Sequence, residues 1–310
     1  MMSGINPTSQ ELLNSINITQ QNISQAQAQI SSGVKISQAS DDPQAIGDLL
    51  TTRADIAQVT QVQSNLTSVQ NEVQTADSSV QSAVQLLQQA SVLATQGANT
   101  LETTDERTAL ATQVTGLLQQ MVTISATQSG GQYIFSGDQT TSAPYEIDPS
   151  NPNNVIQLVN SPSTRLIQDP TGLTFAASLT AQQLFDARDS NGNPTSGNVF
   201  SALENLQTAL ASGDTSAIQT AASGVGSAQD YLNLQSTFYG GVEDRITTAL
   251  NLAQMFQTQD TAQLSSEQDT DVAAEALQMT QDTTQLGAAM AAAAKQPTTS
   301  LFNYFPTTTG

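Results

Sequence analysis

Apolar residues recur every seven positions along much of the chain, with a second set three or four positions away. The pattern is strongest between residues 59 and 97 and predicts a single helix of about 60 Å or more, at 1.5 Å per residue. Apolar residues at this spacing form the contact line of a coiled coil. The two sets are Val59, Leu66, Val73, Val80, Leu87 and Ala94, and Val62, Val69, Ala76, Ala83, Ala90 and Gly97.

Weaker heptad patterns lie at the two ends of the chain. One covers residues 8–34 and ends at Gly33, and the other begins near Val272 and ends before Pro297. Short, weak seams give little helix stability alone, so we expect both terminal segments to be poorly ordered in the monomer. They are therefore the expected contacts between copies, although Ala288–Ala294 could instead be a frayed helix end. The expected assembly interface comprises Leu12, Ile16, Ile23 and Ile30 with Val272, Met279, Leu286 and Met290.

Most of the remaining positions of the terminal seams are small or polar side chains. Near the N-terminus Ile5 is apolar, whereas Thr19 and Ala26 are polar or small, and near the C-terminus the remaining positions are Ala276, Thr283 and Ala293.

Helix start signals divide the strong patterns into separate helices. Asp42 followed by Pro43 predicts a capping residue and a first helical position, which explains these carboxylates better than a catalytic role does. Thr103 and Glu106 form the sequence signature of a capping box. Asp214 predicts the start of a long helix that continues through Phe256.

The middle of the chain changes character. Residues 132–197 hold six of the ten prolines and contain three strand candidates, at 133–135, 155–159 and 173–175. Residues 189–193 resemble part of a calcium loop but lack its full ligand spacing, so a plain turn is the preferred interpretation. We therefore expect a β-rich insertion at 138–197.

The predicted fold is mainly α, a long antiparallel coiled-coil or helical-bundle rod with that small β-rich inserted domain. Its helical rod domain would comprise residues 46–137 and 198–266. Residues 1–45 and 267–310 would form the terminal assembly helices.

Composition removes several classes of function. The 310 residues include no Cys, His or Trp, and 7 Lys and Arg stand against 27 Asp and Glu, a net charge of −20. Without Cys or His there is no thiolate nucleophile, no Ser-His-Asp triad and no Cys- or His-ligated metal site. An acidic chain is a poor ligand for nucleic acid or for anionic membranes. We expect no catalytic, cofactor-binding or metal-binding residues.

The sequence also lacks two targeting signals. No run of about 18 apolar residues predicts a membrane span. The N-terminal residues show no basic segment followed by an apolar core, so no cleaved secretory signal peptide is expected.

Two short motifs resemble a known family. Gln29-Ile30-Ser31-Ser32-Gly33-Val34-Lys35-Ile36 and Ser40-Asp41-Asp42-Pro43 are similar to the N-terminal signature of flagellins and flagellin-like hook-associated proteins. The six-heptad helix, the capping box and the C-terminal Ser300–Phe305 follow in the family's order. Asp-Asp-Pro at 41–43 and Gly131–Gly137 resemble the members that join hook to filament more closely than flagellins. The start, Met1–Ile5, departs from both subgroups.

The resemblance implies a structural protein of the extracellular bacterial flagellum, exported by the flagellar type III apparatus without a cleaved signal peptide. Its partners would be other copies of itself, a neighbouring hook-associated protein, flagellin and a cytosolic export chaperone. The family's chaperone binds the C-terminal segment, here represented by Leu301, Phe302, Tyr304 and Phe305. The alternatives are a minor flagellin, a secreted type III coiled-coil effector and, least favoured, an enzyme that uses paired carboxylates.

Overall fold

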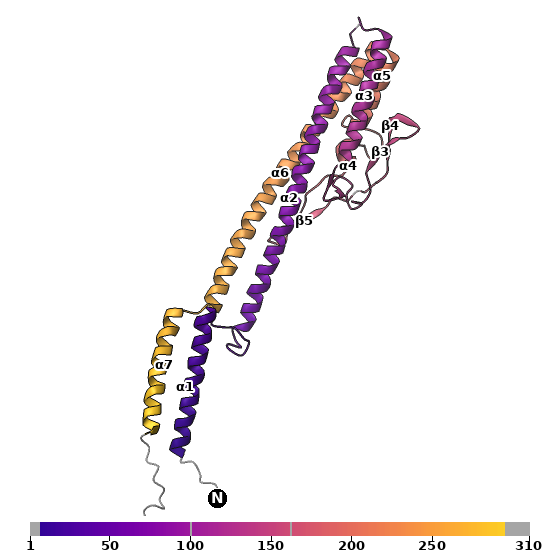
Figure 1. Cartoon of the computed structure of the whole chain (residues 1–310). Coiled ribbons are helices and arrows are strands. Elements are labelled where there is room, and N and C mark those ends of the chain that lie inside the picture. The colour runs from indigo at the N-terminus through magenta and orange to yellow at the C-terminus, as the bar shows by residue number, and fades with distance from the viewer. Residues whose placement is uncertain (1–6, 100, 162, 295–310) are drawn as a thin grey trace, which may run out of the picture. The chain divides into compact units, whose positions relative to one another are not determined.

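The structure is a computed structural model that describes residues 7–99, 101–161 and 163–294, and it divides into two compact units (Figure 1). Unit 1 comprises Met1–Ile56 and Thr258–Gly310, and unit 2 comprises Ala57–Gln257. The predicted division into three parts is finer than this and stays a prediction.

The described residues form seven helices and six short strands. The helices are α1 (Pro7–Ser32), α2 (Ile46–Gly97), α3 (Thr104–Ser125), α4 (Ala181–Phe185), α5 (Val199–Ser212), α6 (Thr215–Gln268) and α7 (Val272–Ala294). The strands are β1 (Gln128–Ser129), β2 (Gln132–Tyr133), β3 (Tyr145–Asp148), β4 (Asn151–Gln157), β5 (Leu166–Gln168) and β6 (Thr174–Ala176). The predicted mainly helical fold with a β-rich insertion is confirmed.

The long helices of unit 2 lie side by side in opposite directions. The Ser236 hydroxyl of α6 donates to Asp77 of α2 at 3.0 Å, and Gln257 of α6 lies 3.5 Å from Thr60 of α2. As the α6 partner moves up in number the α2 partner moves down, so the pair is antiparallel. The heptads predicted for 59–97 form the buried face of α2, where all twelve positions except the half-buried Val62 are buried.

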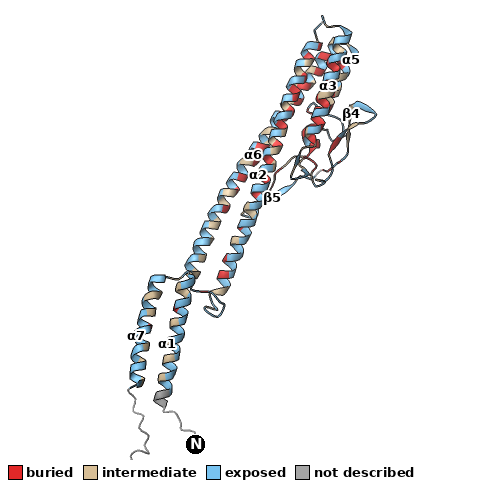
Figure 2. Cartoon of the chain, in the orientation of Figure 1, coloured by how far each residue is buried: buried red, intermediate tan, exposed pale blue. Residues whose placement is uncertain are grey.

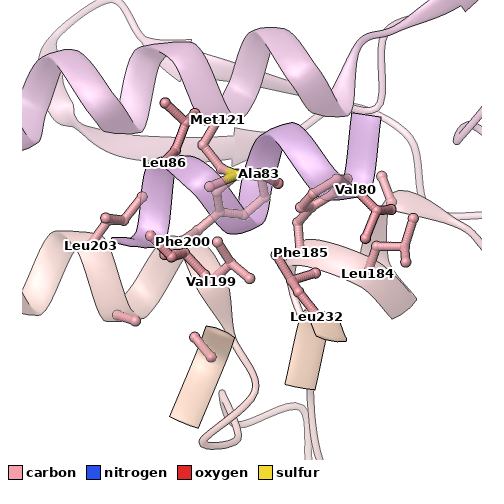
Figure 3. Close-up of a cluster of buried hydrophobic side chains, with 14 of the residues drawn as sticks. Val80, Ala83, Leu86, Met121, Leu184, Phe185, Val199, Phe200, Leu203 and Leu232 are labelled. Carbon is pink, nitrogen blue, oxygen red and sulfur yellow. The ribbon is translucent and has the colours of Figure 1, made fainter. Parts of the chain in front are cut away.

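The core of unit 2 includes side chains from the insertion as well as from the helices. Figure 3 shows Phe185 of α4 and Phe200 of α5 beside Val80 of α2 and Met121 of α3, and Figure 2 shows the buried residues along the facing sides of these helices. Phe135 contacts the Phe185 ring edge-on, with ring centroids 5.8 Å apart. Aromatic anchors of this kind fix the insertion against the helices.

The helix starts predicted at Thr103 and Asp214 are confirmed, whereas Asp42 caps a turn over residues 43–45 and α2 begins only at Ile46, so Pro43 is not its first helical residue. The Asp42 carboxylate accepts hydrogen bonds from the backbone N–H groups of Gln44 and Ala45, as an N-cap does. Thr103 forms the complete capping box with Glu106, and its backbone N–H and its hydroxyl both donate to that carboxylate and lower its pKa. Asp214 accepts from the N–H groups at the second and third positions of α6.

The insertion forms three separate two-stranded antiparallel sheets, which pair β1 with β2, β3 with β4 and β5 with β6. The predicted strand at 155–159 is found earlier, as β4, and the one at 173–175 is found as β6. The strand predicted at 133–135 is wrong beyond Tyr133, because Phe135 leaves the sheet and enters the core. The sequence patterns did not reveal β1, β3, β5 or α4.

The segment 189–193 is a turn, as the sequence favoured. Asp189 accepts the backbone N–H groups of Asn191 and Asn193, and Gly192 has a positive φ of 83°. The carboxylate is thus used to hold the turn.

A buried carboxylate joins the insertion to α5. Asp186 is 3% exposed and accepts hydrogen bonds from the Tyr145 hydroxyl at 3.0 Å, the Asn198 amide at 2.6 Å and the Arg188 guanidinium at 2.9 Å. Burial, together with the charge of Asp186, raises the pKa of the Tyr145 hydroxyl, which therefore stays protonated as a donor. The hydrogen bond to Asp186 raises the pKa of Arg188.

Each of the four arginines of unit 2 has an intramolecular partner. Arg107 donates to three backbone carbonyls, and Arg165 forms an ion pair with Glu72 at 2.6 Å. Arg188 pairs with Asp186, and Arg245 lies 4.4 Å above the ring of Phe175. The cations of this unit therefore serve its own fold.

The half-buried Glu204 of α5 makes the stability of unit 2 depend on pH. Its Oε1 accepts the Val155 N–H at 3.2 Å, while burial, with a smaller contribution from Asp186, raises its pKa. A raised carboxyl pKa means that the folded state favours the protonated form. Stability is therefore lost as the pH rises from the ordinary Glu value of about 4.3 through the folded-state pKa.

We expect Glu204→Gln, which keeps the acceptor oxygen and removes the charge, to raise Tm at neutral pH. Because the stabilisation reflects the lost cost of ionisation, it should shrink as the pH falls towards 4. Thermal melts from pH 4 to 8 measure this difference. Glu146→Gln on the exposed side of β3 is the control, and an equal gain in both variants would contradict the prediction.

Candidate assembly interface

Unit 1 is held together where α1 ends and α7 begins. Gly33 has a φ of 71°, a left-handed conformation that ends α1, and its carbonyl accepts the N–H of Thr270 at 3.0 Å. The N–H of Lys35 donates to the carbonyl of Gln268 at 2.6 Å. These two bonds clamp the turn after α1 to the turn before α7. The two helices leave this point side by side and antiparallel (Figure 1).

The loop before α2 is organised by adjacent aspartates. Asp41 accepts the backbone N–H groups of Gln38 and Ser37, which lower its pKa, and it also accepts the Ser37 hydroxyl. Asp42 caps the turn that leads into α2. The motif Ser40-Asp41-Asp42-Pro43 therefore has a structural role in this chain, because its two carboxylates shape the connection between α1 and α2.

The side of α1 that packs against α7 matches the predicted seam. Its residues are buried or half-buried, whereas most of their neighbours in the helix are exposed, and they are Leu12, Ile16, Thr19, Ile23, Ala26 and Ile30. The corresponding residues of α7 follow a spacing of three and four and are Glu275, Met279, Asp282, Leu286, Ala289 and Ala293.

Three positions of α7 differ from the seam expected from the sequence. Val272, Thr283 and Met290 are exposed, and Asp282 and Ala289 take the inward positions beside the last two. The sequence pattern missed this register because a buried aspartate and an alanine give weaker hydrophobic signals than their neighbours. The signal that could have revealed it is the unbroken spacing from Glu275 to Ala293.

The proposed interface residues thus fall into three groups. Leu12, Ile16, Ile23 and Ile30 of α1, together with Met279 and Leu286 of α7, are half-buried in the helix pair. Val272 and Met290 are exposed on the pair. Leu301, Phe302, Tyr304 and Phe305 lie outside the described residues, as does Ile5.

The described part of unit 1 has almost no buried apolar core. Only Ala26, Ile36 and Leu49 are buried apolar side chains there, whereas unit 2 has a continuous core. Six large apolar side chains of unit 1 are between 46% and 61% exposed, and they are Leu13, Ile18, Leu50, Val272, Leu277 and Met290. Each of these side chains exposes apolar surface to water. Burying that surface against another molecule would stabilise the contact by about 25 cal/mol per Å².

The inward face of α7 carries a charge with no cation opposite. Asp282 is 4% exposed, and its Oδ1 accepts a 3.1 Å hydrogen bond from the Gln278 amide. From residue 7 to residue 32, α1 contains no Lys, Arg or His. A polar group at a coiled-coil contact position lowers stability while restricting the register. Asp282 therefore weakens the pairing of α1 with α7 within one chain.

We expect Asp282→Leu to strengthen that pairing by about 1–2 kcal/mol, because it exchanges a desolvated carboxylate for a buried apolar side chain. Hydrogen exchange of the α7 amides in the purified chain measures the effect as slower exchange. Thr283→Leu, one position away and exposed, is the matched control. Equal exchange rates in the wild type and in Asp282→Leu would show that Asp282 does not weaken the pair.

Within the described residues, no group of three or more Asp, Glu, His or Cys side chains is arranged to hold a metal ion. None of the described helices is long and apolar enough to cross a membrane.

Comparison with known proteins gives this arrangement a family context. Residues 5–140, which include α1, α2 and α3, match the family model of the bacterial flagellin N-terminal helical region. This part of the chain is flagellin-like. The family resemblance read from residues 29–43 is therefore confirmed.

The chain is also similar to a curated hook-associated protein. Flagellar hook-associated protein 3 of Escherichia coli (strain K12) is 24% identical over 189 residues, which cover 59% of this chain and 58% of the relative. The alignment thus spans less than two thirds of that relative's length.

Solved structures show the same fold. The structure of a flagellar hook-associated protein from Vibrio parahaemolyticus has a TM-score of 0.64 at 18% identity and covers 74% of this chain and 100% of its own. The flagellar junction protein FlgL from Legionella pneumophila has a TM-score of 0.56 at 15% identity, covering 71% of this chain and 99% of its own. The chain therefore has the fold of these proteins.

Proposed function

We propose that this chain is a structural subunit of the bacterial flagellum that forms the junction between hook and filament. Its terminal helices α1 and α7 would attach it by coiled-coil packing against the helices of neighbouring subunits. The proposed attachment residues are Leu12, Ile16, Ile23, Ile30, Val272, Met279, Leu286 and Met290.

The observation that carries this proposal is the nearly coreless unit 1. A unit whose described residues include three buried apolar side chains and six large exposed ones is a poor end state for a folded protein. Packing against further helices would bury the exposed side chains. An assembly of copies supplies those helices without any second protein, and closed or helical symmetry repeats the same contact.

The comparisons favour a junction over a filament subunit. The curated relative is named a hook-associated protein, and the Legionella structure is named a flagellar junction protein. The alternative is a minor flagellin. Counting copies per flagellum separates the two, because a junction layer should hold on the order of ten subunits under such symmetry, whereas a filament protein is present in thousands.

Deletion of the gene tests the proposed function directly. We expect cells that assemble hooks but release filament protein into the medium, because filament subunits would lack an attachment site. Electron microscopy of the cells and immunoblots of the medium measure both parts. Intact filaments on the mutant cells would refute the junction role, and complementation with the wild-type chain is the control.

The partners and the export route belong to the same proposal. The neighbours would be other copies, a hook-associated protein and flagellin, and a cytosolic chaperone would cover Leu301, Phe302, Tyr304 and Phe305 until export. The exported chain should keep its full mass, which mass spectrometry of the extracellular protein measures. Loss of an N-terminal segment would contradict export without a cleaved signal peptide.

A non-catalytic role stays a prediction.

The alternative function is that of a membrane-active type III effector. Such a protein would release dye from liposomes, and we expect no release when the purified chain is added.

A further inference from the structure

Unit 2 has a face without charge. Residues 78–101 and 108–137 contain no Asp, Glu, Lys or Arg, in a chain whose net charge is −20. They include the C-terminal part of α2, from residue 78 to Gly97, and nearly all of α3. These two helices lie side by side in Figure 1. The spacing along each helix places eight residues on one face, here called the glutamine face: Gln85, Gln89, Val92, Gln96, Ala109, Gln113, Gly116 and Gln120.

The glutamine face is hollowed at its centre. Gln89, Val92 and Leu93 of α2 and Gln113 and Leu117 of α3 line a groove of about 290 Å³. Val92 is 57% exposed at its rim, and Leu93 and Leu117 form its apolar floor. A groove of this kind accepts a small apolar or amide side chain from another molecule.

Gly116 lies on this face with no reason for being glycine inside the monomer. It is in the interior of α3, where glycine destabilises a helix relative to alanine. A Cβ added there would meet nothing within 4 Å. A missing side chain next to open space lets a second backbone approach closely, so an external contact accounts for it.

The rest of unit 2 explains why the contact would be free of charge. Its four arginines all contact groups of the same chain, and none of them lies in residues 78–101 or 108–137. Another helix, α6, exposes Asp230 and Asp244, with Glu243 half-buried beside them. Two copies of so acidic a chain repel one another wherever acids meet, and least where the surface is neutral.

We propose that the glutamine face is a docking surface for a second copy of this chain, separate from the contacts of α1 and α7. The occupant is a second copy because its unit 2 offers further neutral helical surface. A basic partner would gain nothing from choosing the uncharged face of an acidic protein. The proposal rests on the proposed assembly function and adds a second contact to it.

Photo-crosslinking in living cells tests the contact. A photoreactive amino acid replaces Val92 in the full-length chain, with replacement of Leu234, an exposed apolar residue of α6, as the matched control. We expect a covalent dimer of this chain from position 92, identified by mass spectrometry, and at least fivefold less from position 234. A cross-link from position 92 mainly to another protein, or to nothing, overturns the proposal.

Substitution of Gly116 separates docking from folding. Gly116→Gln places a side chain over the groove and should raise or maintain Tm, since it removes a glycine from a helix interior, while reducing incorporation at least tenfold. Gly241→Gln is the control, because Gly241 is also an open helical glycine but lies beside Glu243 and Asp244. Normal incorporation of Gly116→Gln overturns the proposal.

The same experiments distinguish the two proposals. If wild-type chains reside at the hook–filament junction while both tests at the glutamine face fail, the surface is wrong and the function stands. If wild-type chains are absent from flagella, the function is wrong. A dimer cross-linked through position 92 would still support the surface in that case.

Discussion

Ile23→Asp and Leu286→Asp should each leave the chain folded and prevent its attachment to flagella. Both side chains are half-buried in the pair of α1 with α7, and unit 2 keeps its own core. In the isolated chain the new carboxylate can turn to water. In an assembly that surrounds these helices it would be buried without a partner, which costs several kcal/mol.

Two measurements are needed for this prediction. Circular dichroism and thermal melts of the purified variants should match the wild type, and immunoblots of isolated flagella should show a loss of at least tenfold. Gln27→Asp and Gln285→Asp introduce the same charge at exposed positions of α1 and α7 and are the matched controls. Wild-type attachment of both seam variants would exclude this face of the pair as the interface.

Asp186→Ala should destabilise unit 2 by about 3 kcal/mol, the lower end of the range for removing one partner of a buried ion pair. The substitution leaves the Tyr145 hydroxyl and the Asn198 amide buried without their acceptor. It also releases Arg188, which can still reach water. For a unit of this size, the Tm should fall by about 6–12 °C.

Chemical denaturation monitored by circular dichroism gives the free energy of unfolding. Asp189→Ala is the control, because Asp189 holds an exposed turn three residues away and should cost far less. If both substitutions cost the same, the contacts of Asp186 are not a main support of the insertion.

The long helices could be predicted because their signal is local and repeated. Six heptads from Val59 to Gly97 specify both a helix and its buried face, and no distant residue is needed to interpret them. The caps at Asp42, Thr103 and Asp214 are also local, since each involves side chain and backbone within three positions. These parts of the sequence analysis agree with the structure, except that α2 begins at Ile46, after the turn that Asp42 caps.

The insertion was harder to predict because distant contacts decide its structure. Phe135 continues an apolar run that predicts a strand, yet its ring packs against Phe185, fifty residues later. The strands β1, β2 and β5 have two or three residues each, too few to show alternation. The three hairpins are positioned by anchors such as Tyr145, whose partner Asp186 is distant in sequence.

The sequence predicted that α1 and α7 form the candidate assembly interface, but it did not predict which residues of α7 face α1. On α1 the contrast between isoleucine and polar residues identifies the inward face. On α7 most residues are alanine, threonine or glutamine, so neighbouring registers differ little in apolar content. The choice between Thr283 and Asp282 depends on the packing of α1, which the pattern along α7 does not contain.

The internal pairing of the arginines also determines how salt should act on this protein. Assemblies held by ion pairs weaken as salt is added. Here the four cations of unit 2 are occupied within each chain, and the net charge of −20 leaves repulsion as the main long-range force between copies. At 0.1 M salt that repulsion is screened beyond about 10 Å. Association of the purified chain should therefore strengthen with ionic strength, so that a marine or a freshwater medium would set how readily the subunits join.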